Sequence, residues 1–165
     1  MSEQKYKIVD YVEFNRLMDE FVKHITRLKE KSSNYDFTHI YGPPRGAWPM
    51  VTHLSHHLNL TVITENNFHG HDTNNMNLLI VDDISDTGQT LNMITNKLLA
   101  MADMTPTLNW KTCCLYFKES TKFVPEIFSE QIYDDVWVVF PWEKCDDANK
   151  ECIDFKQRRQ IQTDL

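Results

Sequence analysis

The 165-residue sequence predicts an α/β fold in which helices flank a mostly parallel sheet. Three observations lead to this prediction. Short apolar runs alternate along the chain with longer segments whose apolar residues recur at helical spacing. The run LLIV at 78–81 is apolar at every position, which is typical of a strand covered on both faces. Segments rich in small and polar residues follow two of the expected strands, where ligands bind in parallel sheets.

The individual elements follow from these periodicities in chain order. Apolar residues recur at helical spacing over 11–30, and Asp10 followed by Glu13 predicts a capping box at the start of that helix. Residues 65–77 are polar and without periodicity, and are expected to form a loop. The remaining predicted elements are a strand at 37–41, a helix at 46–58, strands at 60–64 and 78–81, a helix around 91–101, and strands at 110–117 and 136–140.

Length and charge define the class of protein. The length suits a single domain over 1–165. The formal charge is −7 and no Lys/Arg run exceeds two residues, which argues against a nucleic-acid partner. No apolar run approaches the ~20 residues that a membrane helix needs, and the N-terminus lacks the apolar core of a signal peptide. A soluble, cytoplasmic protein that does not bind membranes is therefore expected.

Cysteine and histidine give no sign of a structural metal site. The four cysteines show neither a CxxC pair nor zinc-ligand spacing. Cys113 and Cys114 lie in an apolar run and are predicted to be reduced core residues. His69 and His71 have no third ligand nearby in the sequence, so they are interpreted as solvated loop residues.

The segment DTGQT at 86–90 is a candidate anion site. It lies between a predicted strand and a predicted helix, so backbone N–H groups and the helix dipole would converge on one point. Thr87 and Thr90 add hydroxyl donors, and Gly88 allows a close approach of the backbone. Taken alone, the same segment also fits a tight turn with a helix N-cap.

Two adjacent acids, Asp82 and Asp83, follow directly on the apolar run. Carboxylates at the end of a buried strand are costly to desolvate, and they usually hold a cation or sugar hydroxyls. Together with the anion loop they describe a site for a ribose 5-phosphate. The loop would take the phosphate, the acids would take the 2- and 3-hydroxyls, and Mg²⁺ would offset the charge of a pyrophosphate at C1.

The stretch LLIVDDISDTGQT at 78–90 closely resembles the signature for phosphoribosyl pyrophosphate (PRPP) of the type I phosphoribosyltransferases. The resemblance implies that family's fold, with a small hood built from the terminal segments. It also implies Mg²⁺ as cofactor, with Asp82 and Asp83 as the metal-binding residues. The PRPP-binding residues that it implies are Arg45, Gly46, Asp82, Asp83, Ile84, Ser85, Asp86, Thr87, Gly88, Gln89 and Thr90.

A second segment, YGPPRGAW at 41–48, resembles the family's pyrophosphate loop. Arg45 would contact the leaving pyrophosphate through charge-assisted hydrogen bonds. The family often holds the peptide before this basic residue in cis, so the resemblance predicts a cis Pro44–Arg45 bond. Ala47 departs from the family pattern, in which a second glycine is common. Without the other motif, the segment would also fit a Pro-Pro turn with a solvated arginine.

The segment VWVVFPWE at 136–143 resembles the one with which xanthine, guanine and hypoxanthine phosphoribosyltransferases hold a 6-oxopurine. Trp137 matches the aromatic that stacks on the base, and Val138 the main-chain contact after it. Lys118 falls where those enzymes place a lysine against the purine O6, and an ammonium group, which only donates, favours an oxo over an amino group. A core tryptophan and a solvent-exposed lysine are the plainer alternatives. Val138 and Val139 stand where some relatives carry an acid for a second Mg²⁺.

The resemblance therefore implies an enzyme of purine salvage that works as a homodimer on PRPP and a purine base. Asp86 would be the acid/base partner at purine N7, and Arg45 would assist the departure of pyrophosphate. Loop 65–77 would close over the site to exclude water. It lacks the Ser-Tyr pair that many family members use for closure.

Three alternatives are weighed against this interpretation. A PRPP-binding regulator without catalysis would share the signature, but such proteins need an effector surface, commonly basic, which this acidic chain does not show. A phosphoribosyltransferase for adenine, orotate or uracil would also share it. A response-regulator receiver begins with a similar strand, but only 82 residues follow Asp83 and the DTGQT loop would have no role, so the receiver is rejected.

Overall fold

The computed structural model describes residues 5–65 and 73–143. The chain divides into a larger unit, residues 15–134, and a smaller unit made of residues 1–14 and 135–165. The larger unit contains a five-stranded sheet and the smaller one a two-stranded sheet. The boundary falls within the first helix, α1 (Tyr11–Lys31), after Phe14.

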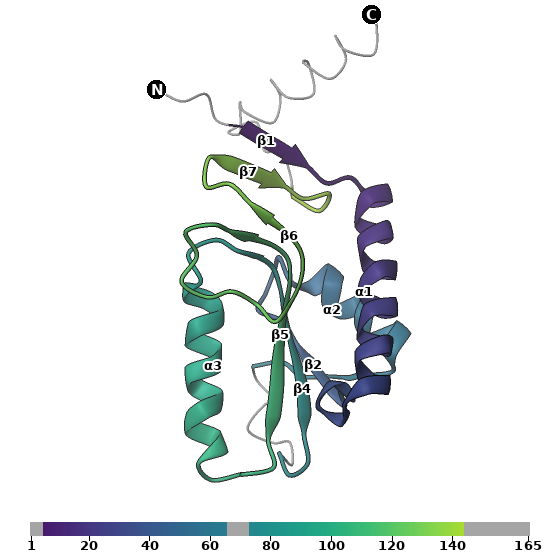
Figure 1. The fold of residues 1–165 in the computed structure, drawn as a ribbon, viewed down its shortest axis with the longest axis vertical. Helices are drawn as coiled ribbons and strands as arrows, with labels where there is room; N and C mark the ends of the chain where they lie inside the picture. The colour runs from purple at the N-terminus through teal and green to yellow at the C-terminus, as the bar shows by residue number, and fades with distance from the viewer. Residues whose placement is uncertain (1–4, 66–72, 144–165) are drawn as a thin grey trace, which may run out of the picture. The chain divides into compact units, whose positions relative to one another are not determined.

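The sheet of the larger unit is parallel throughout, and its strand order is β3-β2-β4-β5-β6 (Figure 1). β4 lies at its centre and pairs with β5 over most of its length. Helix α2 (Trp48–Leu58) connects β2 to β3, and helix α3 (Gln89–Ala102) connects β4 to β5, because parallel neighbours need a crossover connection. The strands are β2 (His39–Tyr41), β3 (Thr61–Val62), β4 (Asn77–Ser85), β5 (Asn109–Lys118) and β6 (Ile127–Ile132).

Helices cover both faces of this sheet. The helix α3 (Gln89–Ala102) lies on one face, and α2 (Trp48–Leu58) lies on the other together with α1 (Figure 1). A short 3-10 helix, η1 (Ser33–Tyr35), follows α1. Because both faces are covered, all four residues of the run at 78–81 have no exposed surface. Cys113 and Cys114 are buried free thiols, which confirms their prediction as core residues.

The smaller unit pairs the two ends of the described chain. Strand β1 (Lys5–Ile8) runs parallel to β7 (Val136–Val139), and Tyr6 lies opposite Trp137. The family resemblance predicted that the terminal segments build a small substructure of their own, and this pairing of β1 with β7 agrees with it. Within the same unit, the ring of Trp142 stacks on Phe140 at 4.9 Å and meets the ring of Phe14 edge-on at 5.2 Å.

Most predicted elements are confirmed, with a few corrections. The capping interaction is present, since the Glu13 N–H donates to Oδ1 of Asp10 at 2.8 Å. Helix α2 begins at Trp48 rather than at residue 46, and α3 begins two residues before the predicted start. Strands β1 and β6 were not predicted. β6 has only its first and last residues buried, so it lacks the alternation by which a strand is recognised.

Two further findings concern the rest of the chain. The predicted loop 65–77 and its histidines His69 and His71 fall largely outside the described residues, since 66–72 are not described. Among the residues that are described, no helix is long and apolar enough to cross a membrane.

Candidate functional site

The two acids lie inside β4, not after it, which corrects the sequence prediction. β4 continues to Ser85, and Asp82 pairs with Cys114 on β5. The Asp82 residue is buried, with 8% of its surface exposed. Each carboxylate accepts a local hydrogen bond: Oδ1 of Asp82 from the N–H of Asp83 at 3.1 Å, and Oδ1 of Asp83 from the N–H of Ile84 at 2.9 Å.

Burial makes the charged form of this pair costly. Desolvation, followed by the charge of Asp83, raises the pKa of Asp82 to about 8. Desolvation also raises the pKa of Asp83. A buried carboxylate beside a partly buried one is stabilised by a cation or by hydroxyl donors. The pair therefore fits the predicted ligands, ribose hydroxyls and a divalent cation.

The second motif packs against these acids. A Cβ atom added to Gly46 would lie 2.8 Å from Cγ of Asp83, too close for two carbon atoms, so only glycine leaves room for that carboxylate. The predicted cis peptide between Pro44 and Arg45 is confirmed. Ala47, which departs from the family pattern, is buried at the start of α2. The side chain of Arg45 is exposed, where a charged ligand can reach it.

The loop from Asp86 to Thr90 leads from β4 into α3. Gly88 forms the N-cap of α3 with a φ of +81°, a left-handed conformation that favours glycine. Asp86, Thr87, Gln89 and Thr90 are exposed. Gly88 has no side chain to cap the helix, and the N–H of Gln89 donates to Oγ1 of Thr87 at 3.4 Å. The first-turn amides of a helix together with its dipole favour an anion. The strand, the glycine at positive φ and the helix start follow one another as expected for this loop, and its binding of phosphate stays a prediction.

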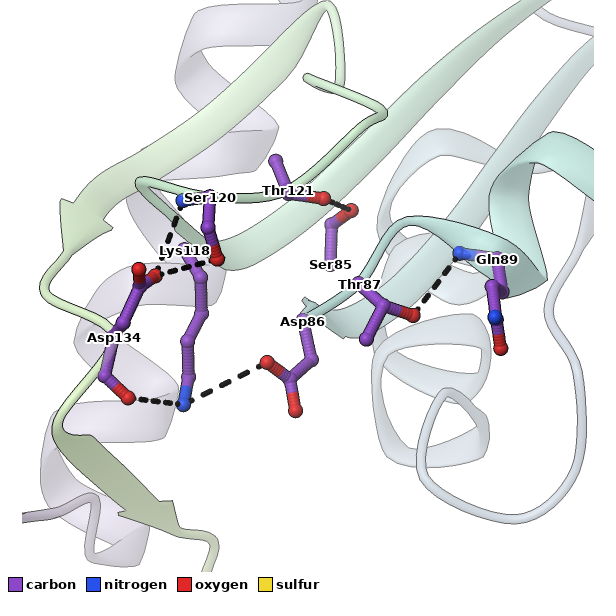
Figure 2. A network of polar contacts seen from close by, with 8 residues as sticks. All are labelled: Ser85, Asp86, Thr87, Gln89, Lys118, Ser120, Thr121 and Asp134. Atoms are coloured by element: carbon purple, nitrogen blue, oxygen red, sulfur yellow. Dashed lines mark hydrogen bonds and ion pairs between the residues drawn. The ribbon is translucent and has the colours of Figure 1, made fainter.

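Lys118 ends β5 and is almost fully buried, with 8% of the residue exposed. The solvent-exposed alternative for this lysine is therefore wrong. Its Nζ donates to the carbonyl oxygen of Asp134 at 3.0 Å and lies 3.6 Å from Oδ1 of Asp86 (Figure 2). An ammonium group is thus directed toward the phosphate loop from the neighbouring strand.

Trp137 and Val138 belong to the smaller unit. Trp137 lies in β7 and is half-exposed, so it is not a core residue of the two-stranded sheet. Val138 is buried. An exposed aromatic face is what stacking on a base requires. The described unit is therefore compatible with the role that the resemblance implied for Trp137.

Residues 5–65 and 73–143 contain no group of three or more His, Cys, Asp or Glu side chains that could hold a metal ion by themselves. Mg²⁺ is commonly bound by one or two carboxylates and completed by substrate phosphates and water. Asp82 and Asp83 fit that pattern.

Three polar residues near the site were not predicted from the sequence: Ser120, Thr121 and Asp134. They lie beyond β5 and at the end of β6, and they form a hydrogen-bonded network with Ser85 and Lys118 (Figure 2). The segment ESTK at 119–122 has no motif that would have marked them. Only the pairing of β5 with β6, which the sequence did not reveal, brings Asp134 near Lys118.

Comparison with known proteins gives one family match and a set of similar folds. The model of the family described as the phosphoribosyl transferase domain matches residues 15–149. A purine phosphoribosyltransferase from Pyrococcus horikoshii OT3 is 22% identical with a TM-score of 0.69, over 86% of this chain and 96% of that one. The Helicobacter pylori xanthine-guanine-hypoxanthine phosphoribosyltransferase is also 22% identical with a TM-score of 0.69, over 91% and 99%.

A third similar structure is that of a hypothetical protein from Neisseria gonorrhoeae with bound ppGpp. It is 15% identical, with a TM-score of 0.68, over 92% of this chain and 97% of that one. At these identities the three structures establish a common fold.

Proposed function

This chain belongs to the phosphoribosyl transferase domain family, and on that basis we propose that it transfers the 5-phosphoribosyl group of PRPP to N9 of a 6-oxopurine. The products are the purine nucleoside monophosphate and pyrophosphate. The observation that carries the proposal is the convergence of two motifs distant in sequence, in which Gly46 of the pyrophosphate loop packs on the Asp83 carboxylate.

Each group of the proposed PRPP-binding residues contacts a different part of PRPP: the ribose, the 5-phosphate or the pyrophosphate. Asp82 and Asp83 accept hydrogen bonds from the 2- and 3-hydroxyls of the ribose, which orients the ring and relieves the cost of the buried carboxylates. The amides and hydroxyls of residues 87–90 hold the 5-phosphate at the start of α3. Arg45 contacts the pyrophosphate and stabilises the charge that develops as it leaves. When bound at the two acids, Mg²⁺ supplies further neutralisation of pyrophosphate charge.

Transfer passes through a ribosyl cation with oxocarbenium character, so positioning accounts for much of the catalysis. Asp86 is exposed on the loop and is proposed as the acid/base partner at purine N7. Its ion pair with Lys118, at 3.6 Å, links the group that handles N7 to the group proposed for O6.

The choice of base rests on Lys118. Its Nζ has only donors, and one of them is already used by the carbonyl of Asp134. A remaining donor directed at position 6 favours the oxo group of hypoxanthine, guanine or xanthine and disfavours the amino group of adenine. Trp137 is proposed to stack on the base and Val138 to contact the ring edge. The Helicobacter protein of the same fold carries these three bases in its name.

The test is to mix the purified protein with Mg²⁺ and PRPP, and to add hypoxanthine, guanine, xanthine, adenine, orotate or uracil separately. Nucleotide and pyrophosphate are measured for each base. We expect turnover with one or more 6-oxopurines, and a loss of about 10²–10⁴-fold in kcat for Asp86→Asn, the range for removal of a general acid or base. PRPP binding without nucleotide from any base would refute the enzyme and favour a PRPP-binding regulator. Turnover only with adenine, orotate or uracil would refute the base assignment.

Catalysis in the cytoplasm by a homodimer stays a prediction from the family resemblance. Analytical ultracentrifugation of the full chain, with and without PRPP, measures the oligomeric state directly.

A further inference from the structure

Two neighbouring hydroxyl residues, Ser120 and Thr121, follow β5 and reach different parts of the proposed site. Figure 2 shows Ser120 beside Asp134 and Thr121 beside Ser85. The connection that carries them, residues 119–126, joins β5 to β6 and contains no helix. Its Phe123 packs against the hydrophobic cluster on the α3 face, which holds the connection in place.

Ser120 fixes the acceptor of Lys118. Its hydroxyl donates to Oδ1 of Asp134 at 2.8 Å, and its N–H donates to the same atom at 3.1 Å. The carbonyl oxygen of Asp134 in turn accepts from Nζ of Lys118 at 3.0 Å. The two hydrogen bonds from Ser120 lower the pKa of Asp134. Ser120 thus positions Lys118 indirectly, by holding Asp134.

Thr121 fixes the residue that precedes the phosphate loop. Ser85 donates its only hydroxyl proton to the carbonyl of Phe123 at 2.8 Å. The hydroxyls of Ser85 and Thr121 lie 3.0 Å apart, and that of Thr121 also lies 3.4 Å from the carbonyl oxygen of Phe123. Ser85 has 3% of its surface exposed, so the loss of this hydroxyl partner would be costly.

The same turn touches the loop at Thr87 and Gly88. The N–H of Lys122 donates to the carbonyl of Thr87 at 3.2 Å. A Cβ added to Gly88 would lie 2.9 Å from Oγ1 of Thr121 and 2.6 Å from the backbone nitrogen of Phe123. The backbone of the phosphate loop therefore packs directly against the β5–β6 connection.

We propose that Ser120 and Thr121 are separate positioning residues: Ser120 sets Lys118 for the purine base, and Thr121 sets the phosphate loop for PRPP. The inference rests on the proposed function, because it assigns the two substrates to Lys118 and to the loop. Neither hydroxyl touches a reacting atom. Their effects differ because each acts on a different neighbour.

The experiment compares Ser120→Ala and Thr121→Val with the full-length wild type. Ser120→Ala removes one of the two bonds to Asp134, and Thr121→Val replaces a hydroxyl by a methyl group of similar size. We expect Ser120→Ala to raise KM for the base about 3- to 10-fold and to reduce the preference for 6-oxopurines over adenine, with KM for PRPP unchanged. We expect Thr121→Val to raise KM for PRPP by a similar factor, with KM for the base unchanged. This range corresponds to one hydrogen bond.

The conservative variants Ser120→Thr and Thr121→Ser keep the hydroxyls and are expected to restore the wild-type values. Their rescue separates positioning from a general loss of packing, as does thermal unfolding of each variant. If both alanine and valine variants raise the same KM, or if both lower only kcat, the separate roles are refuted. Equal KM values in all five proteins refute them as well.

Calorimetric titration with PRPP provides a readout that does not need turnover. Thr121→Val should weaken PRPP binding about 3- to 10-fold, and Ser120→Ala should leave it unchanged. If the wild type binds PRPP but forms no nucleotide, the proposed function fails while this titration still decides the role of Thr121. Equal PRPP affinity in wild type and Thr121→Val would then refute that role.

Discussion

The carboxylate of Asp83 occupies the space that a side chain on Gly46 would need. A Cβ atom on Gly46 would lie 2.8 Å from Cγ of Asp83. This contact joins the loop after β2 to the C-terminal part of β4 within the larger unit. In the proposed mechanism, it sets the pyrophosphate loop beside the residues that hold the ribose.

Gly46→Ala should therefore disturb both stability and PRPP binding. The added methyl group must displace either the loop or the Asp83 carboxylate, and overpacking of this kind costs about 1–3 kcal/mol. Urea denaturation measures the loss of stability, and calorimetry measures the affinity for PRPP, which should fall. The control is the Asp83→Ala background, where the clash is absent and Gly46→Ala should cost much less. If Gly46→Ala lowers the stability equally in both backgrounds, the clash with the Asp83 carboxylate is not its cause.

Asp82→Asn should stabilise the protein while impairing its activity. Because the folded-state pKa of Asp82 is raised to about 8, the folded protein binds more protons than the unfolded chain between pH 4 and 8. The free energy of unfolding of the wild type should therefore fall as pH rises through this window. In EDTA at pH 8, the variant should be more stable by about 1–3 kcal/mol, less than the full shift would give because the surroundings relax.

Denaturation midpoints of wild type and Asp82→Asn, measured from pH 5 to 9, test this expectation. The variant should show the weaker dependence on pH. Asp36→Asn provides a comparison, since Asp36 is paired with Lys29 at the surface and its replacement should change stability little. A variant that is less stable than wild type at pH 8 would contradict the idea that the buried charge is costly.

Lys118→Met should change which bases are used. The substitution keeps an apolar side chain of similar length but removes the donor proposed for the purine O6. Loss of such a donor should lower kcat/KM for hypoxanthine by about 10- to 100-fold and adenine much less. Lys122→Met is the matched control, because Lys122 is exposed on the adjacent turn. An equal loss for hypoxanthine and adenine would indicate that Lys118 supports the loop rather than the base.

The local pattern of the sequence was sufficient for the fold class, and it marked the two segments that are proposed to bind PRPP. An all-apolar run such as 78–81 is typical of a strand covered on both faces, and the structure confirms it. The cis bond before Arg45 was predicted from the resemblance of one short loop. These features depend on residues close together in the chain, so their pattern is visible in the sequence.

Long-range pairing accounts for the features that the sequence did not reveal. The acids were expected after the strand, but hydrogen bonding to β5 extends β4 through them to Ser85, and a polar residue gives no sign that its backbone is paired. Lys118 was expected at a strand end, but the acceptor of its buried Nζ is Asp134, which is brought near by the pairing of β6 with β5. Local sequence thus specifies which groups could bind a phosphoribosyl substrate. The folded chain decides which of those groups are buried and which residues they contact. These properties arise from contacts between residues far apart in the sequence.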